Sequence, residues 1–431
     1  MRVGAARIAG FGETVFATYA RRAAEHGALD LGQGFPSDGP PAFVRAALRD
    51  AADGPQQYAP LPGLPELAKE IAFDHGRWLG RPLDPTGNVQ VTVGATEALF
   101  AALQALVDPG DEVVLFEPFY DAYPAAVTMA GGVVRTVPLE PQADGRWTFD
   151  PSRLAAVVGD ATRAIVLTTP HNPTGTVFRE DELDAIVTAA TRADALLISD
   201  EVYEHLAFAG PVRLATRPGA WERTLTISSF GKTFSATGWK LGWAIGPEPL
   251  IDALRRAHQW IPYAVATPLQ RAAAAVLRRA REDDDAVYRQ LRTEYRARAQ
   301  ALIEALSPTP LRAHLPEGGY FVMADASALG YPDDVAACLD LPARAGVGAI
   351  PPSAFYLPDH RAAARRWIRL AFCKPVPELQ EAGRRLATLA SAPAPPPPPA
   401  TEATQTPRAT KPPTAPPPSA PNAPAPPPPP P

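Results

Sequence analysis

Residues 164–203 read AIVLTTPHNPTGTVFREDELDAIVTAATRADALLISDEVY, and this stretch predicts the fold class. It opens and closes with short apolar runs typical of strands, whereas residues 180–193 show the amphipathic pattern of a helix. A strand, a helix and a second strand in this order form the unit of a parallel sheet that is buried on both faces. Apolar runs of the same kind also occur at residues 112–118, 224–230 and 241–246. The sequence therefore predicts an α/β fold with a mostly parallel sheet, whose ligand lies at the carboxyl ends of the strands.

The rest of the 431-residue chain divides by composition. From about residue 283, an arginine-rich helix followed by the segments GGYFVMAD and RWIRLAF predicts a smaller α+β domain. The last 39 residues hold 20 of the 53 prolines and few side chains that could form a core, so we expect a disordered tail. The tail is either a ligand for a proline-recognition domain or an inert appendage, and no partner motif favours the first. The expected parts are an N-terminal arm with part of the small domain at 1–45, the large domain at 46–282, the small domain at 283–392 and the tail at 393–431.

Composition argues against several classes of function. The formal net charge is −5 and only 20% of the residues are charged, so we expect no basic surface for nucleic acid. The only cysteines are Cys338 and Cys373, without a CxxC pair, and the seven histidines form no HExxH motif. We therefore expect neither a disulfide scaffold nor a metal site. The sequence contains no apolar run long enough to span a membrane and no signal peptide, which predicts a cytoplasmic protein.

Lysine is scarce in this chain, and two of its five lysines lie close together. Lys232 and Lys240 belong to SSFGKTFSATGWK, which follows a predicted strand and is rich in glycine and hydroxyl side chains. Such a segment can bring backbone amides, hydroxyls and one ammonium group close to a phosphate. The other lysine is then free for covalent chemistry, which arginine cannot perform because its side chain stays protonated.

The longer segment SSFGKTFSATGWKLGW, residues 228–243, resembles the pyridoxal-phosphate lysine segment of class I/II (fold type I) aminotransferases. It is most similar to the branch of kynurenine and methionine aminotransferases, and the resemblance covers roughly residues 8–390. The resemblance implies the fold of type I pyridoxal-phosphate transferases, with pyridoxal 5'-phosphate as the cofactor. It also implies that Lys232 binds the cofactor covalently and that Lys240 and Ser229 contact its phosphate.

Further residues match the family in order and spacing. Asp200 ends a predicted strand, where a carboxylate can pair with the ring nitrogen of the cofactor and keep it protonated. Tyr203 and Asn172 resemble the pair that hydrogen-bonds the phenolic oxygen of the cofactor. The predicted catalytic residues are therefore Lys232, Asp200 and Tyr203, and the resemblance implies that the Lys232 amine removes the α-proton of the substrate.

Two more parts of the cofactor site are expected. Backbone amides at the start of a predicted helix favour a phosphate at Gly94, Ala95 and Thr96. The resemblance implies that Tyr120 stacks on the pyridine ring of the cofactor. Tyr58 resembles a tyrosine that reaches across a dimer interface to the phosphate of the neighbouring subunit. This match implies a homodimer with shared active sites.

The substrate needs an anchor for its carboxylate. Arg369 lies in the apolar segment WIRLAF, where an unpaired guanidinium would be costly, and its planar fork matches an α-carboxylate. A structural ion pair is the alternative role. The resemblance implies that Gly34 donates a backbone amide to the same carboxylate, that Asn172 also contacts the substrate, and that Phe16 is an aromatic pocket residue. Phe16, Tyr120 and Tyr263 would form an aromatic wall, which favours large neutral substrate side chains over acidic ones.

The predicted function is an aminotransferase that moves the amino group of a neutral L-amino acid, aromatic or sulfur-containing, to a 2-oxo acid by a ping-pong mechanism. A C–S β-lyase on the same fold is an alternative, because the cofactor residues do not distinguish the two reactions. A transcription regulator with an aminotransferase-like domain is a remote alternative. Such regulators carry a DNA-binding domain ahead of the cofactor domain, and here the resemblance begins within about ten residues of Met1.

Overall fold

The computed structural model describes residues 4–391 of the chain. Residues 13–391 lie in one compact unit, whereas residues 4–12, which contain the short 3-10 helix Ala6–Ile8, belong to another unit. The predicted tail at 393–431 lies outside the described residues. All elements described below belong to the larger unit.

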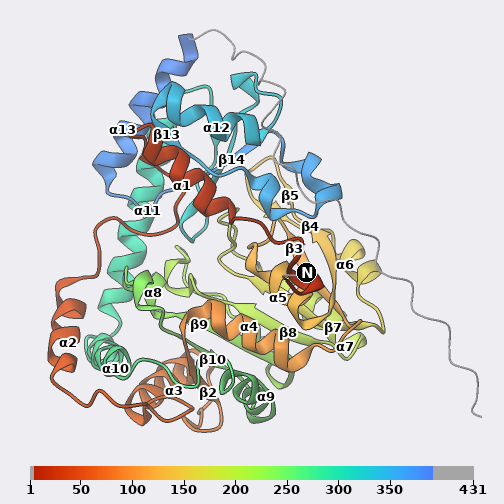
Figure 1. Ribbon diagram of the computed structural model, residues 1–431, viewed down its shortest axis with the longest axis vertical. Helices are drawn as coiled ribbons and strands as arrows, with labels where there is room; N and C mark the ends of the chain where they lie inside the picture. Colours follow the sequence, from red (N-terminus) through yellow and green to blue (C-terminus); the bar gives the residue numbers. More distant parts are fainter. Residues whose placement is uncertain (1–3, 392–431) are drawn as a thin grey trace, which may run out of the picture. The chain divides into compact units, whose positions relative to one another are not determined.

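A seven-stranded sheet forms the centre of the larger unit (Figure 1). Its strands are β2 (Val89–Thr92), β3 (Glu112–Glu117), β4 (Val133–Pro138), β7 (Thr162–Thr168), β8 (Leu196–Asp200), β9 (Thr224–Ser229) and β10 (Gly242–Ile245). They are arranged in the order β2-β10-β9-β8-β7-β3-β4. All neighbouring strands are parallel except that β10 runs antiparallel to both β2 and β9. The predicted α/β fold with a mostly parallel sheet is confirmed.

Helices cover both faces of this sheet, as the apolar runs require. One face packs against α4 (Gly94–Leu106), α5 (Ala122–Ala130) and α9 (Glu248–His258), and the other against α6 (Pro151–Val157) and α7 (Glu180–Arg192). Successive side chains of β7 alternate between the two faces: Ala164 and Val166 pack with the first set of helices, and Ile165 and Leu167 with the second. The central part of the strand therefore has no polar face, which explains the apolar run at residues 164–167.

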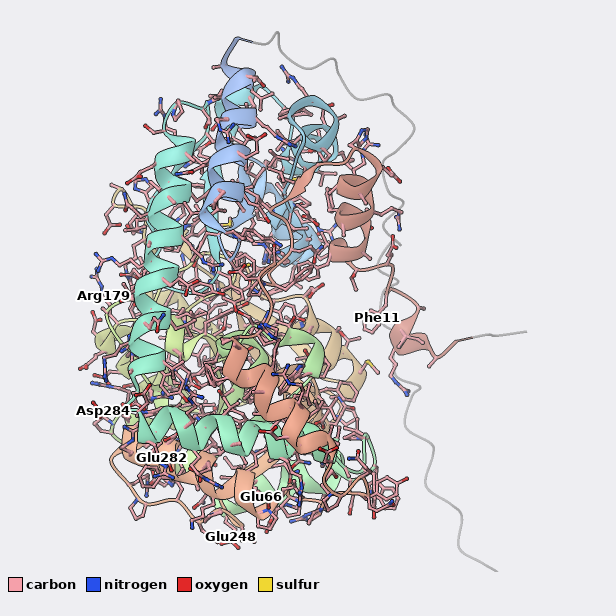
Figure 2. All side chains as sticks on the ribbon, turned by 90° about the vertical axis from the view of Figure 1, so that its left-hand side faces the viewer. Phe11, Glu66, Arg179, Glu248, Glu282 and Asp284 are labelled. Carbon is pink, nitrogen blue, oxygen red and sulfur yellow. The ribbon has the colours of Figure 1, made fainter. Side chains whose placement is uncertain are left out.

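Three more helices pack at the β2 end of the sheet (Figure 1). They are α2 (Ala42–Ala52), α3 (Pro65–Leu79) and α10 (Thr267–Glu282). The turn after α10 leads into α11 (Ala286–Leu306), the longest helix among the described residues. Figure 2 marks this turn by Glu282 and Asp284 and shows α11 rising from it at a steep angle to α10.

A second, smaller sheet lies beside α11. It consists of β11 (Arg312–Ala313), β12 (Phe321–Asp325) and β14 (Trp367–Ala371), all antiparallel, and is accompanied by α12 (Asp334–Ala345) and α13 (Val376–Ala387). The N-terminal helix α1 (Val15–Glu25) packs against α12, and strand β1 (Leu29–Asp30) pairs with β13 (Val347–Gly348). Figure 1 shows α1, α11, α12 and α13 together at one end of the unit. The expected smaller α+β part is therefore present, while its exact limits at 45, 282 and 392 stay a prediction.

The remaining elements are short. Besides several 3-10 helices, they are the two-residue strands β5 (Glu140–Pro141) and β6 (Trp147–Thr148), which form a hairpin, and the one-turn helix α8 (Phe230–Thr233). Within residues 4–391, no helix is long and apolar enough to cross a membrane.

Candidate active site

A cavity of about 330 Å³ lies at the carboxyl ends of β7, β8 and β9, beside the first turn of α4. This is the edge at which the sequence predicts a ligand. The predicted site residues that line the cavity are Phe16, Gly34, Gly94, Ala95, Thr96, Tyr120, Asn172, Asp200, Tyr203, Ser229, Lys232, Lys240 and Arg369. Residues far apart in the sequence therefore meet in one place, although the role of each stays a prediction.

Two predicted residues do not line this cavity. The side chains of Tyr58 and Tyr263 are 83% and 59% exposed, and their rings meet edge to face with centroids 5.4 Å apart. Tyr58 was predicted to act on a neighbouring subunit, so a position outside the cavity of its own chain agrees with that prediction without testing it.

Lys232 lies in α8, the single helical turn that directly follows β9. Its Nζ atom donates a hydrogen bond to the carbonyl oxygen of Gly34 at 3.1 Å, and it lies 5.6 Å and 5.5 Å from the ring centroids of Tyr203 and Tyr320. Burial lowers the pKa of Lys232 to about 8, and the Arg369 guanidinium acts in the same direction. A lysine with this pKa is partly neutral near pH 7, and a neutral amine is the form that attacks a carbonyl.

This lowered pKa gives a first testable prediction. The rate at which cofactor-free protein binds pyridoxal phosphate covalently should rise with pH, with half of the increase reached near pH 8, because the neutral amine of Lys232 is the reactive form. Absorbance spectroscopy can follow the rate between pH 6 and 10. The matched control is lysine in solution with its α-amine acetylated. Its free side-chain amine has an ordinary pKa of about 10.4, which moves the increase to higher pH. A protein profile that follows the control would contradict the prediction.

The other end of the cavity is suited to an anion. Gly94 begins α4 with a positive φ of 72°, a conformation that side chains with a Cβ rarely adopt, and the Nζ atom of Lys240 lies beside it. An added Cβ at Gly94 would lie 3.4 Å from this Nζ atom. Ser229, the last residue of β9, lines the same end. A helix N-terminus with a neighbouring ammonium and hydroxyl group is a typical phosphate site.

Asp200 lies at the end of β8 and is only 4% exposed. One carboxylate oxygen accepts a hydrogen bond from the hydroxyl of Tyr123 at 2.6 Å, and the other accepts one from the backbone N–H of Val202 at 3.3 Å. Burial raises the pKa of Asp200 to about 6, despite these two donors. Among residues 4–391, no cation lies within ion-pair distance of this carboxylate, and the charge of Lys232 offsets the effect of burial only in part. A protonated ring nitrogen would supply a close cation.

Arg369 is the central residue of β14 and is fully buried. Its guanidinium donates to the side-chain oxygen of Asn172 at 3.1 Å and to the carbonyl oxygen of Gly32 at 2.8 Å, while its Nε atom finds no hydrogen-bond partner in the described part of the chain. Within residues 4–391, no carboxylate lies within ion-pair distance of it. Burial lowers its pKa to about 10. The alternative of a structural ion pair is therefore not supported, and the guanidinium remains available to a substrate carboxylate.

Aromatic rings surround this guanidinium, and sequence reasoning missed most of them. The ring centroids of Phe321, Phe355 and Phe16 lie 4.0, 5.1 and 5.2 Å from its central carbon. Only Phe16 was predicted. Phe321 also explains why residue 34 is glycine, because an added Cβ there would lie 2.4 Å from the tip of the Phe321 ring. The segment GGYFVMAD predicts part of the smaller α+β domain, and its aromatic pair, Tyr320 and Phe321, is the sequence signal for this ring.

Tyr123 was also missed, although it forms the shortest contact to Asp200. It lies in the first turn of α5, three residues after Tyr120, and the two rings meet edge to face with centroids 5.6 Å apart. The sequence shows a tyrosine at this spacing, but only the folded chain brings its hydroxyl to a carboxylate 77 residues away.

The chemistry of these side chains fits pyridoxal phosphate. A partly neutral amine, a buried carboxylate without a close cation and a helix N-terminus with an ammonium group match the aldehyde, the ring nitrogen and the phosphate of this cofactor. Lys232, Asp200 and the turn at Gly94 with Lys240 would hold these three groups. When bound, the cofactor supplies an electron sink and carries the amino group.

Comparison with known proteins decides the family. Residues 27–386 match the family described as aminotransferase class I and II. The chain belongs to this family. It is a pyridoxal-phosphate-dependent aminotransferase, as the sequence resemblance predicted.

Relatives of this aminotransferase carry different substrate names. It is 44% identical over 396 residues to a probable N-succinyldiaminopimelate aminotransferase of Mycobacterium tuberculosis, covering 90% of this chain and 98% of the relative. It is 37% identical to a kynurenine–oxoglutarate transaminase of Dictyostelium discoideum, covering 88% and 94%. A solved Escherichia coli structure with a methionine aminotransferase function has a TM-score of 0.84 at 36% identity, covering 90% of this chain and 100% of that one. The reaction class is common to all three, whereas the amino donor differs.

Proposed function

We propose that this aminotransferase takes the amino group of a large neutral L-amino acid, aromatic or sulfur-containing, and transfers it to a 2-oxo acid by a ping-pong mechanism. The observation that carries the proposal is the wall next to Arg369. Phe16 lies between the rings of Tyr120 and Phe355, with centroid distances of 6.4 and 6.1 Å. Such a wall favours the burial of apolar side chains, at about 25 cal/mol per Å².

The charges around the cavity support the same choice of donor. Among residues 4–391, the cationic side chains that line it are Lys232, Lys240 and Arg369. The first two belong to the proposed cofactor contacts, and the third is assigned to the α-carboxylate. A second carboxylate on the substrate would therefore lose water without meeting a countercharge from this chain, at a cost of several kcal/mol.

In the proposed reaction, Arg369 binds the α-carboxylate with its two-pronged fork, assisted by the backbone amide of Gly34. Asn172, which already accepts a hydrogen bond from Arg369, orients the guanidinium and faces the reacting end of the cavity. Lys232 removes the α-proton and returns it, for which a pKa near 8 is well suited. With the cofactor bound, Asp200 would keep its ring nitrogen protonated, and the Tyr203 hydroxyl would be available to its phenolic oxygen.

We also propose the homodimer with shared active sites. Tyr58, Trp260 and Tyr263 support it, since these large aromatic side chains are 83%, 84% and 59% exposed on a single chain. Large exposed aromatic side chains in one region often mark a protein interface. In this arrangement Tyr58 acts on the phosphate of the neighbouring subunit.

A donor panel tests the proposed specificity. Methionine and phenylalanine should exceed aspartate at least about a hundredfold in kcat/KM. A hundredfold ratio corresponds to roughly 2.7 kcal/mol, which is less than the cost of burying the unpaired side-chain carboxylate of aspartate. Phe16→Ala should lower kcat/KM for phenylalanine about tenfold and leave alanine as donor nearly unchanged. The matched control is Phe73→Ala, because Phe73 is 49% exposed on α3 and does not line the cavity.

The same panel separates the other candidates. Comparable kcat/KM values for aspartate and methionine would refute the proposed pocket. N-succinyldiaminopimelate belongs in the panel because of the M. tuberculosis relative, and its preference over methionine would reassign the donor. Thiol release from a cysteine conjugate without any oxo acid would identify the β-lyase reaction instead.

A further inference from the structure

We propose that Lys374 is a positioning residue, which fixes the backbone of residues 32–35 so that Gly34 faces the substrate carboxylate beside Arg369. The inference rests on the proposed carboxylate end of the site and assigns a role to a lysine that the reaction itself does not use. Lys374 lies three residues beyond the end of β14, the strand that carries Arg369.

The surroundings of Lys374 are unusual for a lysine. Its side chain is buried at 5% exposure, and its Nζ atom donates a hydrogen bond to the carbonyl oxygen of Phe35 at 3.1 Å. The same atom lies 4.7 Å from the centroid of the Phe35 ring. Among residues 4–391, no carboxylate lies within ion-pair distance of it. A buried ammonium group without an ion pair is costly. Because most cationic side chains of this protein are arginines, a lysine at such a buried position indicates a specific contact that the lysine makes.

The segment that Lys374 contacts is held at each of four consecutive residues. The carbonyl oxygen of Gly32 accepts from Arg369, the side chain of Gln33 donates to the backbone of Phe16, and the carbonyl oxygen of Gly34 accepts from Lys232. Phe35 is held by Lys374. Gln33, Gly34 and Phe35 line the cavity, so this segment forms part of its wall.

Two of these contacts involve groups that the reaction uses. Lys232 is proposed to bind the cofactor and Arg369 the substrate, so their hydrogen bonds to the segment compete with those ligands. Lys374 does not line the cavity and is not exposed to this competition. Its hydrogen bond to Phe35 therefore persists while the site is filled and keeps the segment in place.

The position of the segment matters because its fit is tight. An added Cβ at Gly34 would lie 2.4 Å from the Phe321 ring, and that ring lies 4.0 Å from the Arg369 guanidinium. A displacement of Gly34 would therefore disturb both the backbone amide and the stacked guanidinium that are proposed to bind the carboxylate. Since every amino acid carries this carboxylate, the effect should not depend on the side chain of the donor.

The test compares Lys374→Met with the wild-type holoenzyme, using methionine, phenylalanine and alanine as donors. We expect KM to rise about tenfold for all three alike, which corresponds to the loss of one hydrogen bond from a charged group. We expect kcat to stay within about threefold, and the cofactor spectrum and retention to be unchanged. Lys374→Gln, which keeps a donor for the Phe35 carbonyl, should recover most of the loss.

Lys69→Met is the matched control, because Lys69 is exposed on α3, and its kinetic constants should equal those of the wild type. An unchanged KM in the cofactor-loaded Lys374→Met enzyme would overturn the inference, and so would a change limited to one donor. If Lys374→Met does not fold, a tenfold higher KM for all three donors in both Lys374→Arg and Lys374→Gln, which each keep a donor for the Phe35 carbonyl, would also overturn it.

Arg369→Lys separates this inference from the proposed function. If Arg369→Lys raises KM for all donors and Lys374→Met does not, only the role of Lys374 is wrong. If Arg369→Lys leaves KM unchanged, the proposed carboxylate end itself is wrong, and the inference falls with it.

Discussion

Replacing Lys232 by alanine should abolish transamination, with kcat falling more than about a thousandfold, since general base catalysis and covalent binding are lost together. Among residues 4–391, the other cationic side chains that line the cavity cannot replace the Lys232 amine. Lys240 lies at the anion end of the cavity beside Gly94, and Arg369 carries a guanidinium that stays protonated at neutral pH. Steady-state turnover with methionine and a 2-oxo acid measures the loss, and borohydride should fix the cofactor to Lys232 in the wild type alone.

The controls for this prediction distinguish chemistry from binding. Lys232→Ala should still bind pyridoxal phosphate non-covalently, because the turn at Gly94, the hydroxyl of Ser229 and the ammonium of Lys240 are untouched. A small primary amine added to the solution should restore part of the activity by occupying the space of the lost side chain. Lys69→Ala should behave as the wild type, since its site is an exposed turn of α3. Wild-type turnover in Lys232→Ala would refute the assignment.

Much of the site could be predicted because strand ends are visible in the sequence. Asp200 ends β8, Lys232 follows β9, and Asn172 follows β7 after a short turn, so the rule for parallel sheets places all three at one edge. Arg369 could be predicted for a different reason. A charge inside an apolar strand has to meet a partner, and the described part of the chain offers it no carboxylate.

Other features depend on packing that no local pattern contains. The hydrogen bond from Tyr123 on α5 to Asp200 at the end of β8 joins residues 77 positions apart, and the stacking of Phe321 on Arg369 exists because β12 and β14 are neighbours. The antiparallel direction of β10 could not be predicted either, since an apolar run indicates a buried strand but not the direction in which it pairs with its neighbours. Tyr58 could be singled out only through the family resemblance, because its proposed contact lies in another subunit.

Replacing Asp200 by asparagine should lower kcat about a hundredfold or more. Asparagine has nearly the same shape and can still accept the hydrogen bond from Tyr123, so the main change is the loss of the negative charge. Breaking a buried ion pair by removing one partner costs about 3–5 kcal/mol, which corresponds to a rate loss of roughly two to nearly four powers of ten. Without that charge the ring nitrogen of the cofactor is not held protonated, and the α-carbanion loses its stabilisation.

Stability measurements can show that this loss of rate is not a loss of folding. Burial raises the pKa of Asp200 to about 6 in the cofactor-free chain, above the value of about 3.9 expected when the chain is unfolded. The ionised carboxylate therefore destabilises the cofactor-free fold above pH 6, and the penalty disappears as the pH falls below about 4. Cofactor-free Asp200→Asn should accordingly melt at the same or a higher temperature than the wild type at pH 7.5.

Two further variants define what the charge of Asp200 contributes. Tyr123→Phe removes the neutral donor but keeps the charge, so its kcat should fall by less than about tenfold, the typical effect of one hydrogen bond. Asp252→Asn is the matched control, because it removes a carboxylate from the surface of α9, where Asp252 pairs with Arg255. Its kinetics should be unchanged. If Asp200→Asn kept kcat within threefold of the wild type, or if Tyr123→Phe were the more damaging change, the pairing of Asp200 with the cofactor ring would be wrong. The role of the buried carboxylate would then be structural, as the acceptor for the Tyr123 hydroxyl and the Val202 backbone N–H at the end of β8.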